Sequence, residues 1–436
     1  MSIIKVDITK SVKKMKPMHG GGQPPIGGKD LIEYFHYLTE AGIPYSRLHD
    51  VGGPYGSGRF VDIPNLFRNF DADENDPANY DFAFTDHLIK ALVEAKVEPY
   101  FRLGVTIENQ GYIKGYNTDP PKDFHKWARI CEHVIMHYTE GWGNGFHYKI
   151  TYWEIWNEPE GQGPGMWNGT AEDYFRLYDI TAKHLKARFP HIKVGGYSCF
   201  GLYAFAPKTV IDPVTNAAVT IPISEKEEQV IEFFYKFFDY IKKHGSPIDF
   251  FSWHSYSNVR RVPQMDKKLH EVLVDLGYGE IETHINEWNP VFREYGTGHH
   301  SAEVSAMLIA LQHGYVDVCC IYDMRTNTAP YCPVFDINTH KPIHAYYSLA
   351  SFNRLYRLGT QVETDCDTPL LCALAASNGE DHALLISNVT GEEQDLCIKG
   401  VDLAKARYYA LDNERLLSWS PAISKIPNNT VILIEW

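Results

Sequence analysis

The sequence between residues 14 and 359 alternates short strand-like runs, rich in β-branched and aromatic residues, with longer runs of helical periodicity. The predicted strands cover 14–20, 43–50, 97–105, 148–157, 192–198, 248–256, 281–288 and 316–324. The predicted helices cover 29–42, 82–96, 123–141, 171–189, 227–245, 266–277, 302–314 and 345–359. Eight such units predict a (β/α)8 TIM barrel with long loops. An open doubly wound sheet is the alternative, but no glycine-rich fingerprint follows a strand.

The sequence changes character after Gly359. Three runs, at 370–389, 406–420 and 430–436, alternate between polar and apolar residues and are separated by turn signals such as NGED and IPNN. This pattern predicts a small accessory antiparallel β-sandwich, which the opening strand SIIKVDI can join. We therefore expect a catalytic barrel over 12–359 and an accessory sandwich over 360–436 together with about 1–11.

Composition excludes several classes of partner. The 436 residues carry a net charge of −14 and no basic stripe, so we expect no nucleic-acid binding. The first 20 residues contain no apolar run long enough for a signal peptide or a membrane span, which predicts no membrane association and a cytoplasmic location. The eight cysteines form no CxxC pair and no zinc-spaced cluster, which favours free thiols over disulfides.

Aromatic residues make up 14% of the chain, with 28 Tyr, 22 Phe and 9 Trp. Most of them are expected to fill a large core, yet flat apolar rings also stack against the faces of sugars. Several of these rings lie close to carboxylates in the stretch TYWEIWNEPE at 151–160.

Two glutamates occupy the ends of predicted strands, where a barrel enzyme carries its catalytic groups. Glu158 follows the fourth strand and Glu287 ends the seventh, each directly after an asparagine and beside aromatic rings. A carboxylic acid and an ionised carboxylate on opposite faces of a sugar are what glycoside hydrolysis requires. At a separation of about 5–5.5 Å the second carboxylate attacks the anomeric carbon and the configuration is retained.

Other glutamates compete for these roles. Glu154 lies in the middle of its strand, where a salt bridge in the barrel wall is the better interpretation. Glu160 lies beyond Pro159 on a loop, and Glu282 lies near the start of its strand, a position that indicates stability rather than chemistry.

The motifs WEIWNEPE, DFFSWHSYSN and THINEWNP, in this order, resemble family 39 of the glycoside hydrolases, which includes retaining β-xylosidases and α-L-iduronidases. The resemblance implies that Glu158 is the general acid/base and Glu287 the nucleophile. It implies that Asn157 binds the sugar 2-hydroxyl. It also implies that Tyr256 donates a hydrogen bond to the nucleophile and that His254 and His49 bind sugar.

Three further residues are candidate substrate contacts, although their sequence patterns are less specific for sugar binding. Trp288 and Trp167 can act as sugar platforms or as core residues. In the loop after the eighth strand, where the family's xylosidases carry acidic residues, this chain has Asp323, Arg325, Asn327 and Asp336, of which Arg325 is the candidate sugar contact. Arg102 stands where an acidic residue is common in the family.

The expected activity is retaining exo-glycosidase action on an oligosaccharide or glycoside, most specifically β-xylosidase. Arabinosidase, galactosidase and iduronidase activities are alternatives, as are a non-catalytic carbohydrate-binding barrel and a metal-dependent hydrolase. We expect no cofactor and no metal, since His299 and His300 are adjacent in a loop without further ligands. A homo-oligomer is possible by analogy with the family.

Overall fold

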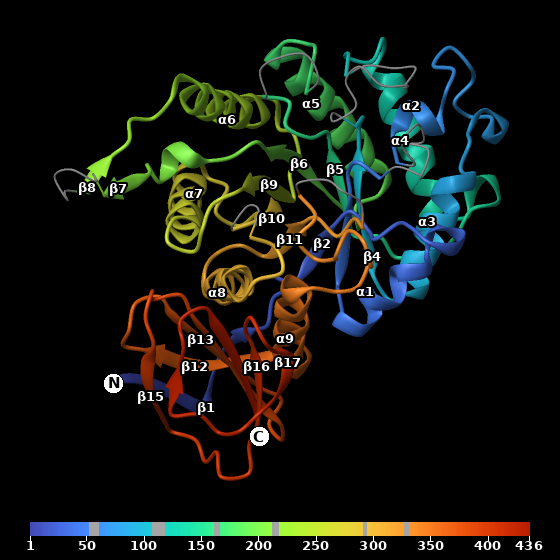
Figure 1. The fold of residues 1–436 in the computed structure, drawn as a ribbon. Coiled ribbons are helices and arrows are strands. Elements are labelled where there is room, and N and C mark those ends of the chain that lie inside the picture. Colours follow the sequence, from blue (N-terminus) through green and yellow to red (C-terminus); the bar gives the residue numbers. More distant parts are fainter. Residues whose placement is uncertain (52–60, 107–117, 161–165, 212–217, 291–293, 327–330) are drawn as a thin grey trace.

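The computed structural model describes residues 1–51, 61–106, 118–160, 166–211, 218–290, 294–326 and 331–436. Eight parallel strands close into a barrel in the order β10-β11-β2-β3-β4-β5-β6-β9 (Figure 1). The barrel strands are β2 (Gly20–Gly22), β3 (Tyr45–Leu48), β4 (Glu98–Leu103), β5 (Tyr152–Ile155), β6 (Lys193–Cys199), β9 (Phe250–Ser255), β10 (Glu282–Trp288) and β11 (Val318–Tyr322). The prediction of a (β/α)8 barrel is confirmed.

Helices surround the barrel, and their ends follow local sequence signals. The α-helices are α1 (His36–Ala41), α2 (Ile63–Leu66), α3 (Ala83–Glu94), α4 (Phe124–Thr139), α5 (Ala171–Arg188), α6 (Glu225–His244), α7 (Val262–Leu276), α8 (Gly298–His313) and α9 (His344–Leu358). The longest, α6, begins at a capping box in which the side chains of Ser224 and Glu227 each bond the other's backbone N–H. It ends at Gly245, whose φ of 64° only glycine adopts without strain.

The start of the barrel differs from the sequence prediction. The first barrel strand is Gly20–Gly22 rather than 14–20, because Lys14 still belongs to β1 (Ser2–Lys14) in the second sheet. A run of glycines has no strand propensity, so only its pairing with Ser46 and Cys320 makes it a strand. The predicted helix at 29–42 is also wrong in its first half, where short 3₁₀ turns precede α1.

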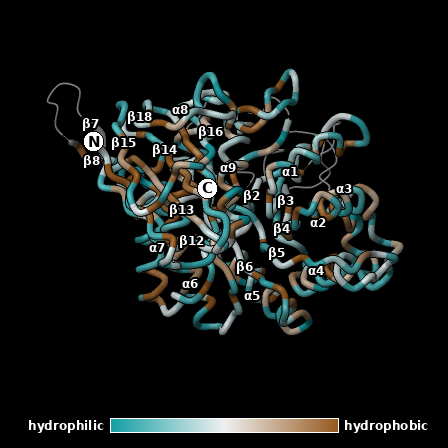
Figure 2. Tube along the Cα trace, turned by 90° about the horizontal axis from the view of Figure 1, so that it is seen from below, coloured by the Kyte–Doolittle hydropathy of each residue, from teal (hydrophilic) through white to brown (hydrophobic). Residues whose placement is uncertain are grey.

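A second, curled and mostly antiparallel sheet follows the barrel in the order β17-β16-β19-β14-β13-β12-β1-β15-β18. Its later strands are β12 (Thr360–Cys366), β13 (Leu371–Ser377), β14 (His382–Asn388), β15 (Gln394–Lys399), β16 (Arg407–Leu411), β17 (Leu416–Ser420), β18 (Lys425–Ile426) and β19 (Thr430–Glu435). The opening strand β1 pairs with both β12 and β15, so the two ends of the sequence share this sheet. Seen from below, the sheet lies in front of the barrel (Figure 2).

The central strands of the second sheet are buried on both faces, and successive side chains along each strand point to opposite faces. On β14, Leu384 and Ile386 point into a small core inside the curled sheet. Leu385 between them belongs to the large core that the barrel helices share. The sheet is therefore packed against α8 and α9 rather than tethered by a linker.

A small hairpin, β7 (Thr209–Ile211) with β8 (Ala218–Thr220), extends outward beyond α6 and α7 at the left of Figure 1. None of the helices in the described ranges combines the length and the apolar character that a membrane crossing requires. All eight cysteines are free thiols, and five of them are buried.

Candidate active site

Four barrel strands bring the predicted site residues to one end of the barrel. Arg47 lies on β3, one residue before its end, and His49 follows that strand. Asn157 and Glu158 follow β5. His254 lies on β9 with Tyr256 just beyond it, and Glu287 lies on β10. Because all eight strands are parallel, their carboxyl ends meet at one mouth. Residues up to 240 positions apart in sequence are thus in direct contact, as Arg47 and Glu287 are.

The backbone turns sharply where Glu158 leaves β5. Trp156 and Glu158 have φ angles of 71° and 49°, in the left-handed region that non-glycine residues rarely adopt. The Glu158 N–H points to the carbonyl oxygens of Tyr197 and Ser198 at 3.1 and 3.2 Å. Strain of this kind is concentrated at functional sites, and here it aims the Glu158 side chain across the mouth.

Glu158 lies in a desolvated position. The residue is 7% exposed, and its Oε1 forms a 2.6 Å hydrogen bond with Nδ1 of His254. Burial raises the pKa of Glu158 to about 8, because a carboxylate loses hydration there. Burial also lowers the pKa of His254 to about 4, which leaves the imidazole neutral at pH 7.

Glu287 is equally buried, at 5% exposed, but two donors hold it. Arg47 donates to Oε1 at 2.8 Å and the Tyr256 hydroxyl donates to Oε2 at 2.9 Å. Burial raises the pKa of Glu287, while the Arg47 charge and the hydrogen bond from Tyr256 act in the opposite direction. Of the two glutamates, Glu287 is therefore the one whose ionised form the site stabilises.

The separation of the two carboxyl groups distinguishes a retaining from an inverting glycosidase. One oxygen of Glu158, one oxygen of Glu287 and a ring nitrogen of His254 lie within 4.8 Å of one another. Retaining glycosidases have carboxyl groups about 5–5.5 Å apart, whereas inverting enzymes need about 6.5–9.5 Å to admit a water. The spacing fits direct attack by one carboxylate on a sugar carbon.

The same three donor atoms could in principle ligate a cation. A dication there would face the Arg47 guanidinium, which already neutralises Glu287 at 2.8 Å. The adjacent pair His299 and His300 binds two different partners, Glu294 and Asn289, and does not converge on one point.

Arg47 organises the floor of the site. Its fully buried guanidinium donates to Glu154, to Asn157 Oδ1 at 2.6 Å and to Ser198 Oγ at 2.7 Å, in addition to Glu287. The expected barrel-wall salt bridge of Glu154 is confirmed, with N···O of 2.7 Å. The sequence leaves Arg47 open between a structural arginine that holds a carboxylate and a substrate contact, and no local signal shows that it links Glu154 to Glu287.

Two predicted sugar-binding residues keep polar atoms available. Asn157 uses its Oδ1 for Arg47, and its buried Nδ2 has no hydrogen-bond partner among the described residues. The same holds for Nδ1 of His49, whose Nε2 lies 3.3 Å from Asp50 and 3.7 Å from Glu287. Buried polar groups are almost always hydrogen-bonded, so both atoms suit a bound ligand.

The two predicted tryptophans are core residues in this structure. Trp167 is 5% exposed, packs edge-on against Trp156 at 4.8 Å and donates to the Thr170 carbonyl at 2.8 Å. Trp288 is 1% exposed within the large core. The indole N–H of Trp288 is buried and has no hydrogen-bond partner among the described residues.

The loop after β11 carries Arg325, which donates to Asp323 at 2.6 Å and lies over the Tyr322 ring. Tyr331 on the same loop lies 5.7 Å from Tyr256, which connects the loop to the site. Asn327 lies outside the described residues.

Arg102, unusual for the family, has a structural explanation. It donates to Asp62 at 2.8 Å and to the His49 carbonyl, and thereby holds the loop that carries His49.

Sequence reasoning missed the burial of Glu160. The residue is 8% exposed and accepts a hydrogen bond from the Phe200 N–H, while its Oε2 has no hydrogen-bond partner among the described residues. Burial, and then the nearby Glu158, raise the pKa of Glu160 to about 8. Its position after Pro159 indicated an exposed loop, and nothing local in the sequence indicates otherwise.

Comparison with known proteins agrees with this geometry. The model of the glycosyl hydrolases family 39 matches residues 42–294, which includes both glutamates. A β-xylosidase of Caldicellulosiruptor saccharolyticus is 22% identical over 78% of this chain and 71% of its own length. A β-xylosidase of Geobacillus stearothermophilus is 26% identical over 40% of this chain, and the match spans about a third of that protein.

Solved structures share the whole architecture. A glucosidase from Croceicoccus marinus superposes with a TM-score of 0.78 at 18% identity, covering 100% of this chain and 98% of its own. A monomeric β-xylosidase from Caulobacter crescentus gives 0.70 at 16% identity, covering 100% and 99%. Barrel, second sheet and matched motifs together show that this chain belongs to family 39 of the glycosyl hydrolases.

Proposed function

We propose that the chain is a retaining glycosidase that cleaves a terminal sugar by double displacement. The observation that carries this proposal is the distance below 4.8 Å between carboxyl oxygens of Glu158 and Glu287. That distance is shorter than the separation of about 6.5–9.5 Å that an inverting pair of carboxyl groups keeps in order to admit a water.

In the first step Glu287 is the nucleophile. One of its carboxylate oxygens bonds to the anomeric carbon, and the bond from that carbon to the leaving oxygen breaks. Glu158 gives its proton to the leaving oxygen, a role that its pKa of about 8 supports at neutral pH. Asn157 donates its available amide to the sugar hydroxyl next to the attacked carbon.

In the second step water replaces the leaving group. Glu158, now ionised, takes a proton from the water. At the same time the oxygen of the water bonds to the anomeric carbon, and the bond from that carbon to Glu287 breaks. Two inversions give net retention. The donors Arg47 and Tyr256 favour the return of Glu287 to its ionised state.

For the sugar we propose a β-linked xylose. The supporting observation is that two relatives with significant sequence similarity are named β-xylosidases. Another relative is named an α-1,4-L-rhamnosidase, and a structural neighbour is a glucosidase, so other glycosides belong in the test.

Two measurements test the proposal. A panel of nitrophenyl glycosides that includes xyloside, arabinoside, galactoside, glucoside and iduronide should give the highest kcat/KM with the β-xyloside. If the protein hydrolysed another glycoside and not the xyloside, the assignment of β-xylose would be wrong, while the double-displacement mechanism would still stand.

A 2-fluoro glycoside of the best sugar traps the covalent intermediate. Peptide mass spectrometry should find the label on Glu287. Label on Glu158 or Glu160, or an inverted product by NMR, would reject the mechanism.

A further inference from the structure

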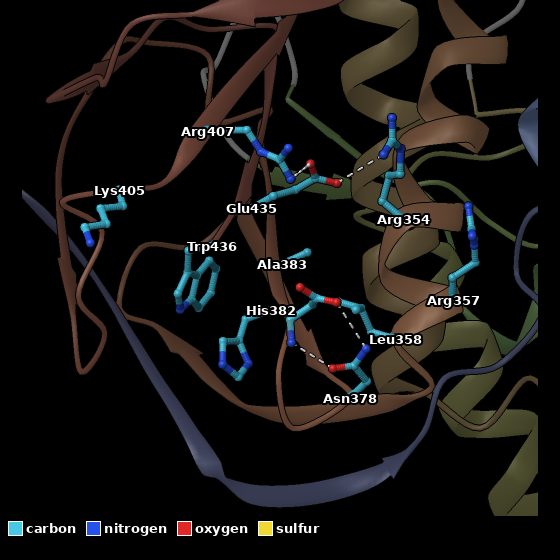
Figure 3. A pocket seen from close by; sticks show the side chains of 11 residues that line it. Arg354, Arg357, Leu358, Asn378, His382, Ala383, Lys405, Arg407, Glu435 and Trp436 are labelled. Carbon is cyan, nitrogen blue, oxygen red and sulfur yellow. Dashed lines mark hydrogen bonds and ion pairs between the residues drawn. The ribbon is translucent and has the colours of Figure 1, made fainter.

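A second polar cavity lies away from the catalytic mouth, where the end of α9 meets the second sheet (Figure 3). It has a volume of about 480 Å³, within the range of roughly 300–1,000 Å³ that small-molecule sites occupy. In a βα unit the helix returns against its strand, so the end of α9 lies opposite the mouth that holds Glu158 and Glu287. The cavity is therefore separate from the candidate active site.

The cavity is positively charged although the chain carries a net charge of −14. Its cationic lining residues are Arg354, Arg357, Lys405 and Arg407, against the two carboxylates of Asp381 and Glu435. Among the lining side chains, four cations and two carboxylates leave an excess of two positive charges. An excess of this sign attracts anions from solution.

The ion pairs of the cavity leave two cations available. Glu435 accepts from Arg354 at 3.4 Å and from Arg407 at 3.3 Å. Arg357 and Lys405 form no hydrogen bond or ion pair with any described residue, and Figure 3 shows them on opposite sides of the cavity. A ligand in the cavity can thus meet a guanidinium on one side and an ammonium on the other.

The remaining lining suits a sugar ring. Trp436 and His382 lie together, with ring centroids 5.4 Å apart, and backbone hydrogen bonds of 3.0 and 3.1 Å join the two residues. The Asn378 side chain lies at the rim, where its Oδ1 accepts from the N–H groups of Glu380 and Asp381 and its Nδ2 donates to Asp381. The indole ring of Trp436 presents an apolar face against which a sugar ring can stack.

We propose that this cavity binds an anionic pyranose, that is, a sugar ring bearing a carboxylate or a sulfate ester. Arg357 contacts the anionic group, since a guanidinium matches a carboxylate or sulfate in a bidentate way. Trp436 contacts the ring. The site would hold an acidic glycan at a distance from the cleft where a glycosidic bond is cut, and its existence does not depend on the proposed catalytic activity.

Isothermal titration calorimetry with the full chain tests the proposal. We expect glucuronate or glucose 6-sulfate to bind at least about tenfold more tightly than glucose, a difference of about 1.4 kcal/mol. Binding of glucuronate alone identifies a carboxylate as the anionic group, and binding of glucose 6-sulfate alone identifies a sulfate ester. Equal affinity for glucose, absence of binding by both acids, or inorganic sulfate binding as tightly as the acids (an adventitious ion only) would overturn the proposal.

Variants locate the binding. Arg357→Ala should weaken binding of the acidic sugar at least about tenfold. The control is Arg68→Ala, which removes an exposed arginine just after α2 that pairs with Asp81 and should leave the affinity unchanged. Unchanged affinity in Arg357→Ala would overturn the assignment to this cavity. Arylglycoside turnover should continue unchanged at saturating acidic sugar, and competitive inhibition would assign the binding to the catalytic cleft instead.

Discussion

At the scale of single residues, the site separates two chemically identical side chains by their surroundings. Glu158 meets a neutral histidine, whereas Glu287 meets a guanidinium and a phenol. Different environments are what give two carboxyl groups different protonation states and different roles. Three predictions belong to this scale.

The first concerns the nucleophile. Glu287→Gln keeps the size of the side chain but removes the attacking oxygen's charge, so kcat should fall by about 10⁴-fold or more. Sugar binding, measured by calorimetry, should persist within a few fold. The matched variant Glu282→Gln, on the same strand but near its start, should retain turnover. Wild-type kcat in Glu287→Gln would reject the assignment.

The second concerns pH. Glu158 must be protonated, and its pKa is raised to about 8, so activity should be lost as pH rises through about 8. Glu287 must be ionised, and burial raises its pKa, so activity should be lost as pH falls toward and below that pKa. The kcat/KM profile should be a bell with an optimum near pH ~5–7. An alkaline limb that persists unchanged in Glu158→Gln would show that another group sets it.

The third concerns Glu160. A carboxyl whose pKa is raised by folding contributes full stability below its unfolded value near 4.5, and loses it as pH rises toward about 8. Glu160→Gln removes this loss and can keep the bond from the Phe200 N–H. The variant's Tm should therefore fall less between pH 5 and pH 8 than that of the parent. Exposed Glu94→Gln serves as the control and should follow the parent curve.

At the scale of secondary-structure elements, the barrel aligns residues from separate strand ends. Tyr256 follows β9 and reaches Glu287 on the neighbouring β10 at 2.9 Å. The strand and helix rhythm of the sequence predicts these elements because period-two and period-3.6 patterns are local. It fails at Gly20–Gly22, whose strand conformation depends on its partners β3 and β11.

The contact between β9 and β10 can be measured. Tyr256→Phe removes one donor to the nucleophile and should lower kcat/KM by about 10–100-fold, since a hydrogen bond to a charged group contributes about 1.5–3 kcal/mol. The acidic limb of the pH profile should move to higher pH, because Glu287 loses a donor to its ionised form. A change in KM alone, with the pH profile unmoved, would indicate a substrate contact instead.

At the scale of the whole molecule, the second sheet and the barrel share one hydrophobic core. Leu385 on β14 is fully buried in that core, among residues of the barrel helices. Leu385→Ala should reduce the free energy of unfolding by about 2–5 kcal/mol. The control is Leu416→Ala, where the side chain is 40% exposed and the loss should be small. Equal losses in chemical denaturation would mean that the sheet does not contribute to the common core.

Local patterns in the sequence were enough to predict the βα rhythm, the alternating tail and the two glutamates at strand ends, because each depends on residues a few positions apart. The packed fold was needed to show that Arg47 links Glu154 and Glu287, that Glu160 is buried, and that a basic cavity forms where α9 meets the second sheet. These features arise from residues far apart in the chain. Burial, which sets their pKa values and charges, is a property of the packed molecule and not of any segment of it.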